Sequence, residues 1–136
     1  MLPQAFLDRL NQLASDYGVR LALLFGSAAS GRTHERSDVD VALLFRETPD
    51  FDRFAKFQHE LQMELPGRKL DLVLLEHADP LLLKKITESC GLIYGDVREL
   101  ERLKTYAFRR YQDHRRFLEL EREYVHRFIE EVNAGR

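Results

Sequence analysis

Two short apolar runs on either side of a polar loop limit what this chain can fold into. Residues 19–25, VRLALLF, and residues 39–45, VDVALLF, are rich in Val, Leu and Phe and have the length of buried strands. The loop between them, residues 26–37, is mostly polar and contains glycine. We therefore expect two neighbouring strands joined by this loop.

Helical periodicity appears on both sides of this pair. Apolar residues at helical spacing follow Pro3 and stop at Gly18, which suits a left-handed cap. Thr48 and Pro49 begin a second such pattern, which residues 66–67 end. The residues expected to face the core are Phe6, Leu10, Leu13, Ala14 and Tyr17 in the first helix, and Phe51, Phe54, Leu61 and Leu65 in the second.

A third strand, a third helix and an edge strand complete the expected sheet region. Residues 69–75, KLDLVLL, return as a strand, and Asp79 and Pro80 cap a helix that Gly91 closes. Residues 91–95, GLIYG, form a short edge strand. The third helix should turn Leu82, Leu83 and Ile86 toward the core. Strands and helices in this order predict an α+β protein.

The last part of the chain predicts one long helix over residues 96–133. Asp96 is a suitable N-cap with Glu99 three residues later, and no Gly or Pro interrupts the pattern before Gly135. Its apolar seam consists of Leu100, Leu103, Ala107, Tyr111, His114, Leu118, Val125, Phe128 and Val132. Such a helix is roughly 50 Å long, which exceeds the width of the domain behind it. Its far end therefore either bends back over the sheet or remains available to a partner.

Composition places the chain among globular proteins of one domain. It has 136 residues, of which 44% are hydrophobic and 32% charged, and no linker or repeat divides it. We expect one domain over residues 1–136, with residues 1–95 as its core. The apolar runs are far shorter than the roughly 20 residues that span a bilayer, and no signal peptide is evident, which favours a cytoplasmic protein. A net charge of −2 argues against a protein that mainly grips nucleic acid.

Three aspartates interrupt apolar segments that would otherwise be buried. Asp38 and Asp40 alternate with valines, so a strand would direct both carboxylates to one side. Asp71 lies within the apolar run of residues 69–75. Like charges held this close repel each other unless a proton or a cation lies between them. Oxygen ligands without paired His or Cys suit Mg²⁺, which binds a few carboxylates together with substrate phosphates.

A Gly-Ser pair at the start of the loop can bind phosphate. Gly26 and Ser27 follow directly on the strand predicted over residues 19–25. Glycine permits a tight turn there, and the next backbone amides can open a helix whose N-terminus attracts phosphate. Taken alone, such a pair is an ordinary turn. The two aspartates that follow ten residues later, Asp38 and Asp40, make a nucleotide site the better interpretation.

The spacing of these residues resembles the signature of the nucleotidyltransferase superfamily. The chain is similar to its smallest members, the minimal nucleotidyltransferases of the MntA antitoxin type. The likeness covers the first helix, GSAASGRTHERSDVDVALL, the acidic strand KLDLVLL, the GLIYGD turn and the long charged helix. It implies the nucleotidyltransferase fold, in which a small mixed β-sheet is flanked by helices.

The resemblance also implies a role for each site residue. Gly26 and Ser27 would hold the nucleotide phosphates of ATP, the co-substrate. Asp38 and Asp40 would bind Mg²⁺, and Asp71 would complete the metal site or accept a proton from the acceptor, so that all three aspartates are catalytic. For Asp71 a structural interpretation stays open as well, in which it pairs with a Lys or Arg or lies at a sheet edge.

The function implied by the resemblance is that of an antitoxin. It would be an ATP- and Mg²⁺-dependent adenylyltransferase that places AMP on a tyrosine of a HEPN-domain ribonuclease toxin. Two alternatives stay open: a non-catalytic antitoxin that covers its partner, and an enzyme that nucleotidylates a small molecule. The complete set of site residues disfavours the first, and the missing substrate domain disfavours the second. Neither a membrane nor direct nucleic-acid binding is expected.

Overall fold

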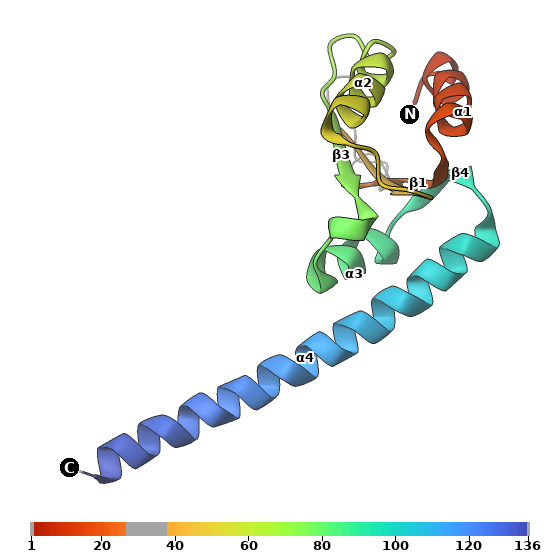
Figure 1. The fold of residues 1–136 in the computed structure, drawn as a ribbon. Helices are drawn as coiled ribbons and strands as arrows, with labels where there is room; N and C mark the ends of the chain where they lie inside the picture. Colours follow the sequence, from red (N-terminus) through yellow and green to blue (C-terminus); the bar gives the residue numbers. More distant parts are fainter. Residues whose placement is uncertain (1, 27–37, 136) are drawn as a thin grey trace.

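The computed structural model describes residues 2–26 and 38–135, which form a sheet with helices on both faces (Figure 1). In chain order its elements are α1 (Gln4–Tyr17), β1 (Val19–Phe25), β2 (Val39–Phe45), α2 (Phe51–Gln62), β3 (Leu70–Leu74), a short 3-10 helix (Leu75–His77), α3 (Pro80–Glu88), β4 (Gly91–Gly95) and α4 (Val97–Ala134). Both strands that flank the polar loop have the predicted bounds. No helix in this part of the chain combines the length and apolar character needed to cross a bilayer.

The sheet is mixed, with the strand order β3-β2-β1-β4. β1 pairs with β2 and with β4 in antiparallel fashion, whereas β2 and β3 are parallel. A parallel pair needs a crossover connection, and α2 supplies it between β2 and β3. The predicted fold class, a small mixed sheet flanked by helices with a long C-terminal helix, is confirmed.

Each face of the sheet carries its own hydrophobic cluster. α1 and α2 cover one face, and α3 and the first part of α4 cover the other (Figure 1). Alternate residues of β2 point to opposite faces of the sheet. Val39, Val41 and Leu43 pack in the first cluster, under α1 and α2, and Ala42 packs in the second cluster, under α3 and α4. The sheet is therefore an interior layer, and a charge within it has to lie near a strand end.

The second helix starts later than the sequence predicted. Asp50 is its N-cap, and its side chain accepts a hydrogen bond of 2.8 Å from the backbone N–H of Arg53. Thr48 instead donates to the carboxylate of Glu76. The later start changes which residues face inward: Phe51 is 84% exposed, and Phe57 is buried in its place. The expectation that Phe51 faces the core was wrong.

The predicted end of the third helix was also wrong. Asp79 caps α3 as expected and accepts a hydrogen bond from the backbone N–H of Leu82. The helix ends at Glu88, and Gly91 does not close it but begins β4, where it pairs with Leu24. The strand predicted over residues 69–75 is shorter as well, because its last residue already belongs to the 3-10 helix.

An ion pair fixes the start of α4 to the sheet. Asp96 caps the helix and accepts a hydrogen bond of 2.9 Å from the backbone N–H of Arg98. Glu99 does not complete a capping box. Its carboxylate pairs with the guanidinium of Arg20 in β1, at 2.8 Å, through three hydrogen bonds. This contact joins the first turn of α4 to the start of β1.

α4 leaves the domain instead of bending back over it (Figure 1). Leu100 and Ala107 are buried in the second cluster, and Tyr111 and His114 are partly buried. Every residue from 115 to 135 is exposed. The helix of 38 residues is about 57 Å long, so roughly half of its length is not covered by any of the described residues.

We expect that removing residues 117–136 changes the free energy of unfolding by less than about 1 kcal/mol, because the described residues of this segment bury nothing. Leu83→Ala, in the cluster beneath α4, should instead cost roughly 2–5 kcal/mol. Urea unfolding of the two variants would check this. A truncated protein as unstable as the Leu83 variant would mean that the helix tip folds against the domain.

Candidate functional site

The parallel pairing of β2 with β3 sets two of the predicted site residues side by side. Asp40 and Asp71 are direct partners in the register, so their backbones lie about 4.8 Å apart. Partners in a register direct their side chains to the same face of the sheet. Two residues further along, Ala42 and Val73 pack in the second cluster, which assigns both aspartates to the face that carries α3 and α4. Both aspartates are only partly exposed.

Asp38 lies directly before β2 and is exposed. The next residue, Val39, donates a backbone hydrogen bond of 2.8 Å to the carbonyl of Lys69, which starts the ladder between β2 and β3. The structure thus brings Asp38, Asp40 and Asp71 to one end of the sheet. Burial raises the pKa of Asp40, and the neighbouring carboxylates of Asp71 and Asp38 raise it further.

Gly26 closes the site on the β1 side. Its φ is +72°, and a Cβ added to it would lie 2.5 Å from Oδ2 of Asp40. Glycine is therefore needed for the backbone conformation and also for the space that the carboxylate occupies. Ser27, the other predicted phosphate-binding residue, lies outside the described residues, as do residues 28–37.

The surroundings of Asp71 fit both the catalytic and the structural interpretation of this residue. It lies beside Asp40, and it also lies near a lysine on an edge strand. Its Oδ1 lies 3.6 Å from Nζ of Lys69, and β3 is an edge strand of the sheet. The side chain of Lys69 is 71% exposed and that of Asp71 41%, so this ion pair stabilises the fold little and leaves the carboxylate free to exchange partners. Lys69 was missed at the sequence level. Its position two residues before Asp71 is the signal that could have indicated it.

The donor set at this end of the sheet fits a hard divalent cation. Three carboxylates without His or Cys match the ligands of Mg²⁺, and their repulsion, visible in the raised pKa of Asp40, is what a cation would relieve. Within residues 2–26 and 38–135, no three acidic, His or Cys side chains converge into a ready-made metal cage. Mg²⁺ does not require one, because it keeps several waters and shares phosphate oxygens with the substrate.

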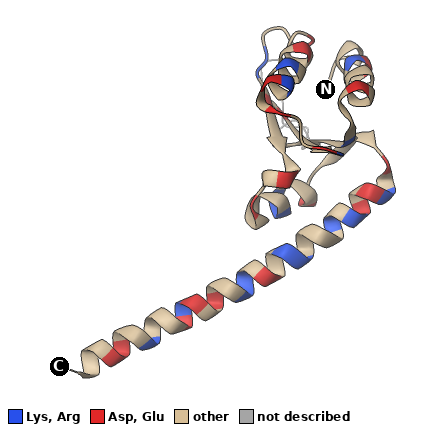
Figure 2. Cartoon of the chain, viewed as in Figure 1, with Lys and Arg blue, Asp and Glu red and all other residues tan. Residues whose placement is uncertain are grey.

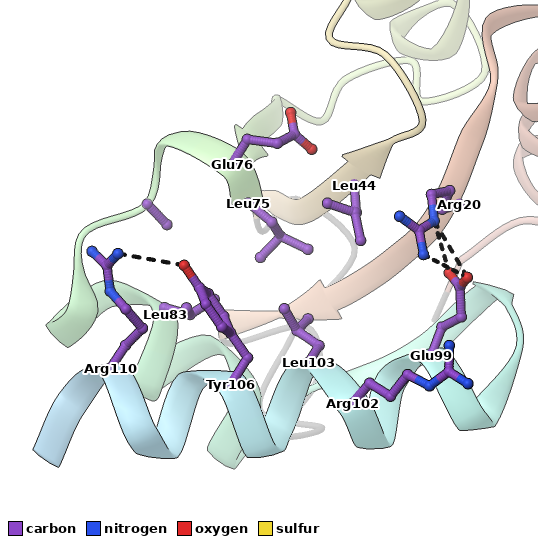
Figure 3. Close-up of a pocket in the computed structure, with 11 residues that line it drawn as sticks. Arg20, Leu44, Leu75, Glu76, Leu83, Glu99, Arg102, Leu103, Tyr106 and Arg110 are labelled. Atoms are coloured by element: carbon purple, nitrogen blue, oxygen red, sulfur yellow. Dashed lines mark hydrogen bonds and ion pairs between the residues drawn. The ribbon is translucent and has the colours of Figure 1, made fainter. Parts of the chain in front are cut away.

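A separate cavity of about 370 Å³ lies at the opposite end of the strands (Figure 3). Leu44, Leu75, Leu83, Leu103 and Tyr106 contribute to its wall, and the ion pair between Arg20 and Glu99 borders it. Leu44 follows Asp40 by four residues, which places the cavity roughly 13 Å from the carboxylates. The cavity therefore belongs to the junction between α4 and the sheet and is not part of the site.

A family model described as "Polymerase beta, Nucleotidyltransferase" matches residues 8–99, which is more than half of the chain. The chain belongs to this nucleotidyltransferase family. The matched segment contains Gly26, Ser27 and all three aspartates, and it ends in the first turn of α4. The resemblance to minimal nucleotidyltransferases of the MntA type, inferred from the motif spacing, is confirmed by the relatives below.

Two relatives of this nucleotidyltransferase come from Methanocaldococcus jannaschii and Thermococcus cleftensis. The chain is 37% identical over 83 residues to a provisionally named protein adenylyltransferase of Methanocaldococcus jannaschii, a match that covers 60% of this chain and 82% of the relative. Protein adenylyltransferase MntA of Thermococcus cleftensis is 36% identical over 63 residues, covering 46% of this chain and 63% of the relative. A chain in a crystal structure described as a toxin-antitoxin with AMP-PNP superposes with a TM-score of 0.71 at 25% identity, covering 90% of this chain and 97% of that one.

We expect Asp40→Asn to raise the melting temperature of this nucleotidyltransferase at pH 7 in buffer containing EDTA. Because the pKa of Asp40 is raised in the folded protein, its ionisation opposes folding, and the amide removes that penalty. The gain should vanish as the pH falls below the ordinary value of 3.8, where the carboxyl group is protonated in both states. Asp113→Asn, at an exposed position in α4, is the control and should show no such gain. Equal shifts in both variants would contradict the assignment.

We expect Gly26→Ala to impair nucleotidyl transfer more than stability. The positive φ costs about 1 kcal/mol, and the added Cβ displaces the Asp40 carboxylate, which should slow transfer roughly tenfold to a hundredfold. Gly67→Ala is a matched control, because Gly67 has a φ of +79° with nothing within 4 Å of an added Cβ. Unfolding and nucleotidyl-transfer assays on both variants would test this. If both lose activity equally, the contact with Asp40 has no role.

Proposed function

We propose that this nucleotidyltransferase is an antitoxin that transfers AMP from ATP to a tyrosine of a partner HEPN ribonuclease toxin and thereby neutralises it. The observation that carries the proposal is the pairing of Asp40 with Asp71 beside Gly26, which gathers carboxylates where a strand end can receive phosphates. A protein acceptor is supported by relatives named protein adenylyltransferases. A toxin partner is supported by the similar structure described as a toxin-antitoxin with AMP-PNP.

In this proposal the end of β1 receives the triphosphate. The backbone at Gly26 and the hydroxyl of Ser27 hold its phosphates, and Asp38 and Asp40, with Asp71, would hold Mg²⁺. When bound, Mg²⁺ neutralises negative charge on the reacting phosphates and on the departing pyrophosphate. Gly26 leaves the space beside it to the Asp40 carboxylate, which therefore lies next to the strand end that would receive the phosphates.

The transfer exchanges one phosphorus–oxygen bond for another. The phenolic oxygen of the acceptor tyrosine bonds to the α-phosphorus of ATP, and the bond from that phosphorus to the bridging oxygen breaks, releasing pyrophosphate. Asp71 takes the phenolic proton as general base. Its partly exposed position at the sheet edge supports this role, because a bulky acceptor can approach an edge strand.

We expect the double variant Asp38→Ala with Asp40→Ala to lose AMP transfer by at least about a thousandfold, because both proposed Mg²⁺ ligands are removed. Asp71→Asn should slow transfer about a hundredfold with nearly unchanged ATP affinity, since the amide keeps the shape but cannot accept the proton. Transfer of labelled AMP to the HEPN partner and calorimetric titration with ATP would measure both effects. Equal losses of transfer and ATP affinity in Asp71→Asn would assign that residue to the metal site alone.

The same variants separate the two alternative functions. If the protein acts by covering its partner, the folded double variant Asp38→Ala with Asp40→Ala would still neutralise the toxin. The partner would then carry no AMP. A small-molecule enzyme would prefer hydroxylated compounds to any protein acceptor in a competition assay. Either result would overturn the proposal.

A further inference from the structure

One flank of α4 carries two shallow grooves that follow each other along the helix. The first, of about 500 Å³, lies between α3 and α4, and α4 lines it with Lys104, Phe108, Tyr111 and Arg115. The second, of about 420 Å³, lies on the projecting half, where Leu118, Arg122, Val125 and Ile129 line it. These eight residues, which we call the flank stripe, alternate in steps of four and three residues.

That spacing selects a helix as the occupant. Alternating steps of three and four residues repeat every 3.5 residues on average, which is the period at which two helices interdigitate along their length. An extended segment has a period of two and would lose register with the stripe within a few residues. Five of the eight residues of the stripe are apolar or aromatic, from Phe108 to Ile129, so it can bury the apolar side of an amphipathic helix.

The groove between α3 and α4 is lined by three bases and one acid, opposite in sign to the whole chain, whereas the outer groove has one base and one acid. Their lining residues include four bases, Lys84, Lys104, Arg115 and Arg122, and two acids, Glu88 and Glu121. The chain as a whole has 21 bases and 23 acids. Figure 2 shows Lys and Arg positions recurring along α4 from the domain toward its middle. An occupant with acidic flanks therefore complements this surface.

The cations of the grooves are available for a partner. Lys84 pairs with Glu88, Lys104 with Glu101 and Arg115 with Glu119, and Lys84 also lies over the ring of Tyr111. The ion pairs are solvent-accessible and three or four residues apart on one helix, so each stabilises it by only a few tenths of a kcal/mol. Arg122 forms no ion pair within the described part of the chain. Carboxylates of a partner can replace the internal ones at little cost.

A second copy of this chain fits the stripe poorly. A dimer with twofold symmetry brings the same surface of each copy into contact, so the stripe would face itself. In a parallel pair Arg115 and Arg122 of one copy would lie against the same arginines of the other, and in a fully overlapped antiparallel pair they would face Leu118 and Tyr111 with no carboxylate to pair them. Like charges at a partly buried interface repel, which favours a different, acidic protein.

We propose that the flank stripe binds an acidic amphipathic helix of the protein that accepts AMP. The identity of the partner rests on the proposed function. The description of the surface does not depend on it. α3 and α4 pack on the face of the sheet that carries Asp40 and Asp71, so a protein bound in these grooves lies on the side of the carboxylates. Binding there raises the local concentration of the acceptor at the site.

A pair of matched double variants of the full chain tests the surface. Leu118→Ser with Arg122→Glu alters the stripe, and Leu120→Ser with Arg127→Glu makes the same chemical changes elsewhere on the helix. Leu118 and Leu120 are 46% and 57% exposed, and Arg127 is about 140° around the helix from Arg122. Helix propensity and net charge therefore change equally in both.

Two designed helical peptides, each about three heptads long with a leucine seam, serve as probes, one flanked by Glu and the other by Lys. In fluorescence anisotropy the Glu peptide should bind the parent chain at least about tenfold more tightly than the Lys peptide, with an advantage that shrinks at high salt. The stripe variant should lose about tenfold in affinity for the Glu peptide, and the matched variant should stay within about twofold. Equal binding of both peptides, or equal losses in both variants, overturns the proposal.

AMP transfer to the HEPN partner separates this inference from the proposed function. The stripe variant should raise the KM for the partner about tenfold with kcat unchanged, while the matched variant behaves as the parent. Transfer that is equal in both variants refutes the stripe as the docking surface. Peptide binding as expected without AMP transfer to any protein supports the stripe and refutes the proposed function. A dimer of the chain alone in light scattering, lost in the stripe variant, assigns the surface to a second copy and overturns the proposal.

Discussion

The parallel pairing of β2 with β3 is the constraint on which the candidate site depends. It sets Asp40 opposite Asp71 at the end of the sheet where β1 stops, and among the described residues no cation lies firmly between the two carboxylates. The fold accepts this repulsion because the rest of both strands is apolar and packs on two sides. A site of this kind stores unfavourable electrostatics in the free protein that binding of a cation and a nucleotide can release.

The sequence allowed the strands, the caps at Asp79 and Asp96 and the three aspartates to be located, because period and capping chemistry are local properties. It did not locate the start of α2, since Thr48, Pro49 and Asp50 are all plausible first residues and only the contact of Thr48 with Glu76 separates them. The partners of Glu99 and Asp71 were missed for a related reason. Arg20 lies 79 residues from Glu99, and no local pattern reports a contact over such a distance. The close approach of Gly26 to Asp40 likewise depends on the pairing of β1 with β2.

The two halves of α4 follow different physical rules. The first half is held by burial of Leu100 and Ala107 and by the ion pair of Arg20 with Glu99, so its direction is set by the sheet. The second half has only its own backbone hydrogen bonds and side-chain pairs, and isolated helices of such length are marginal in water. Its apolar residues are therefore more readily explained by a bound partner than by the stability of the free chain.

Because α4 is continuous from its anchored first turn to its tip, the direction in which its grooves face is tied to the number of residues between them. Inserting one residue after His114 would rotate everything beyond it by about 100° and separate the two grooves, although no lining side chain would be changed. Inserting seven residues would shift the outer groove by roughly 10 Å but restore its direction to within about 20°. The number of residues in the helix thus sets both the direction in which the outer groove faces and its distance from the domain. Relatives that share this surface are free to differ in helix length chiefly by whole heptads.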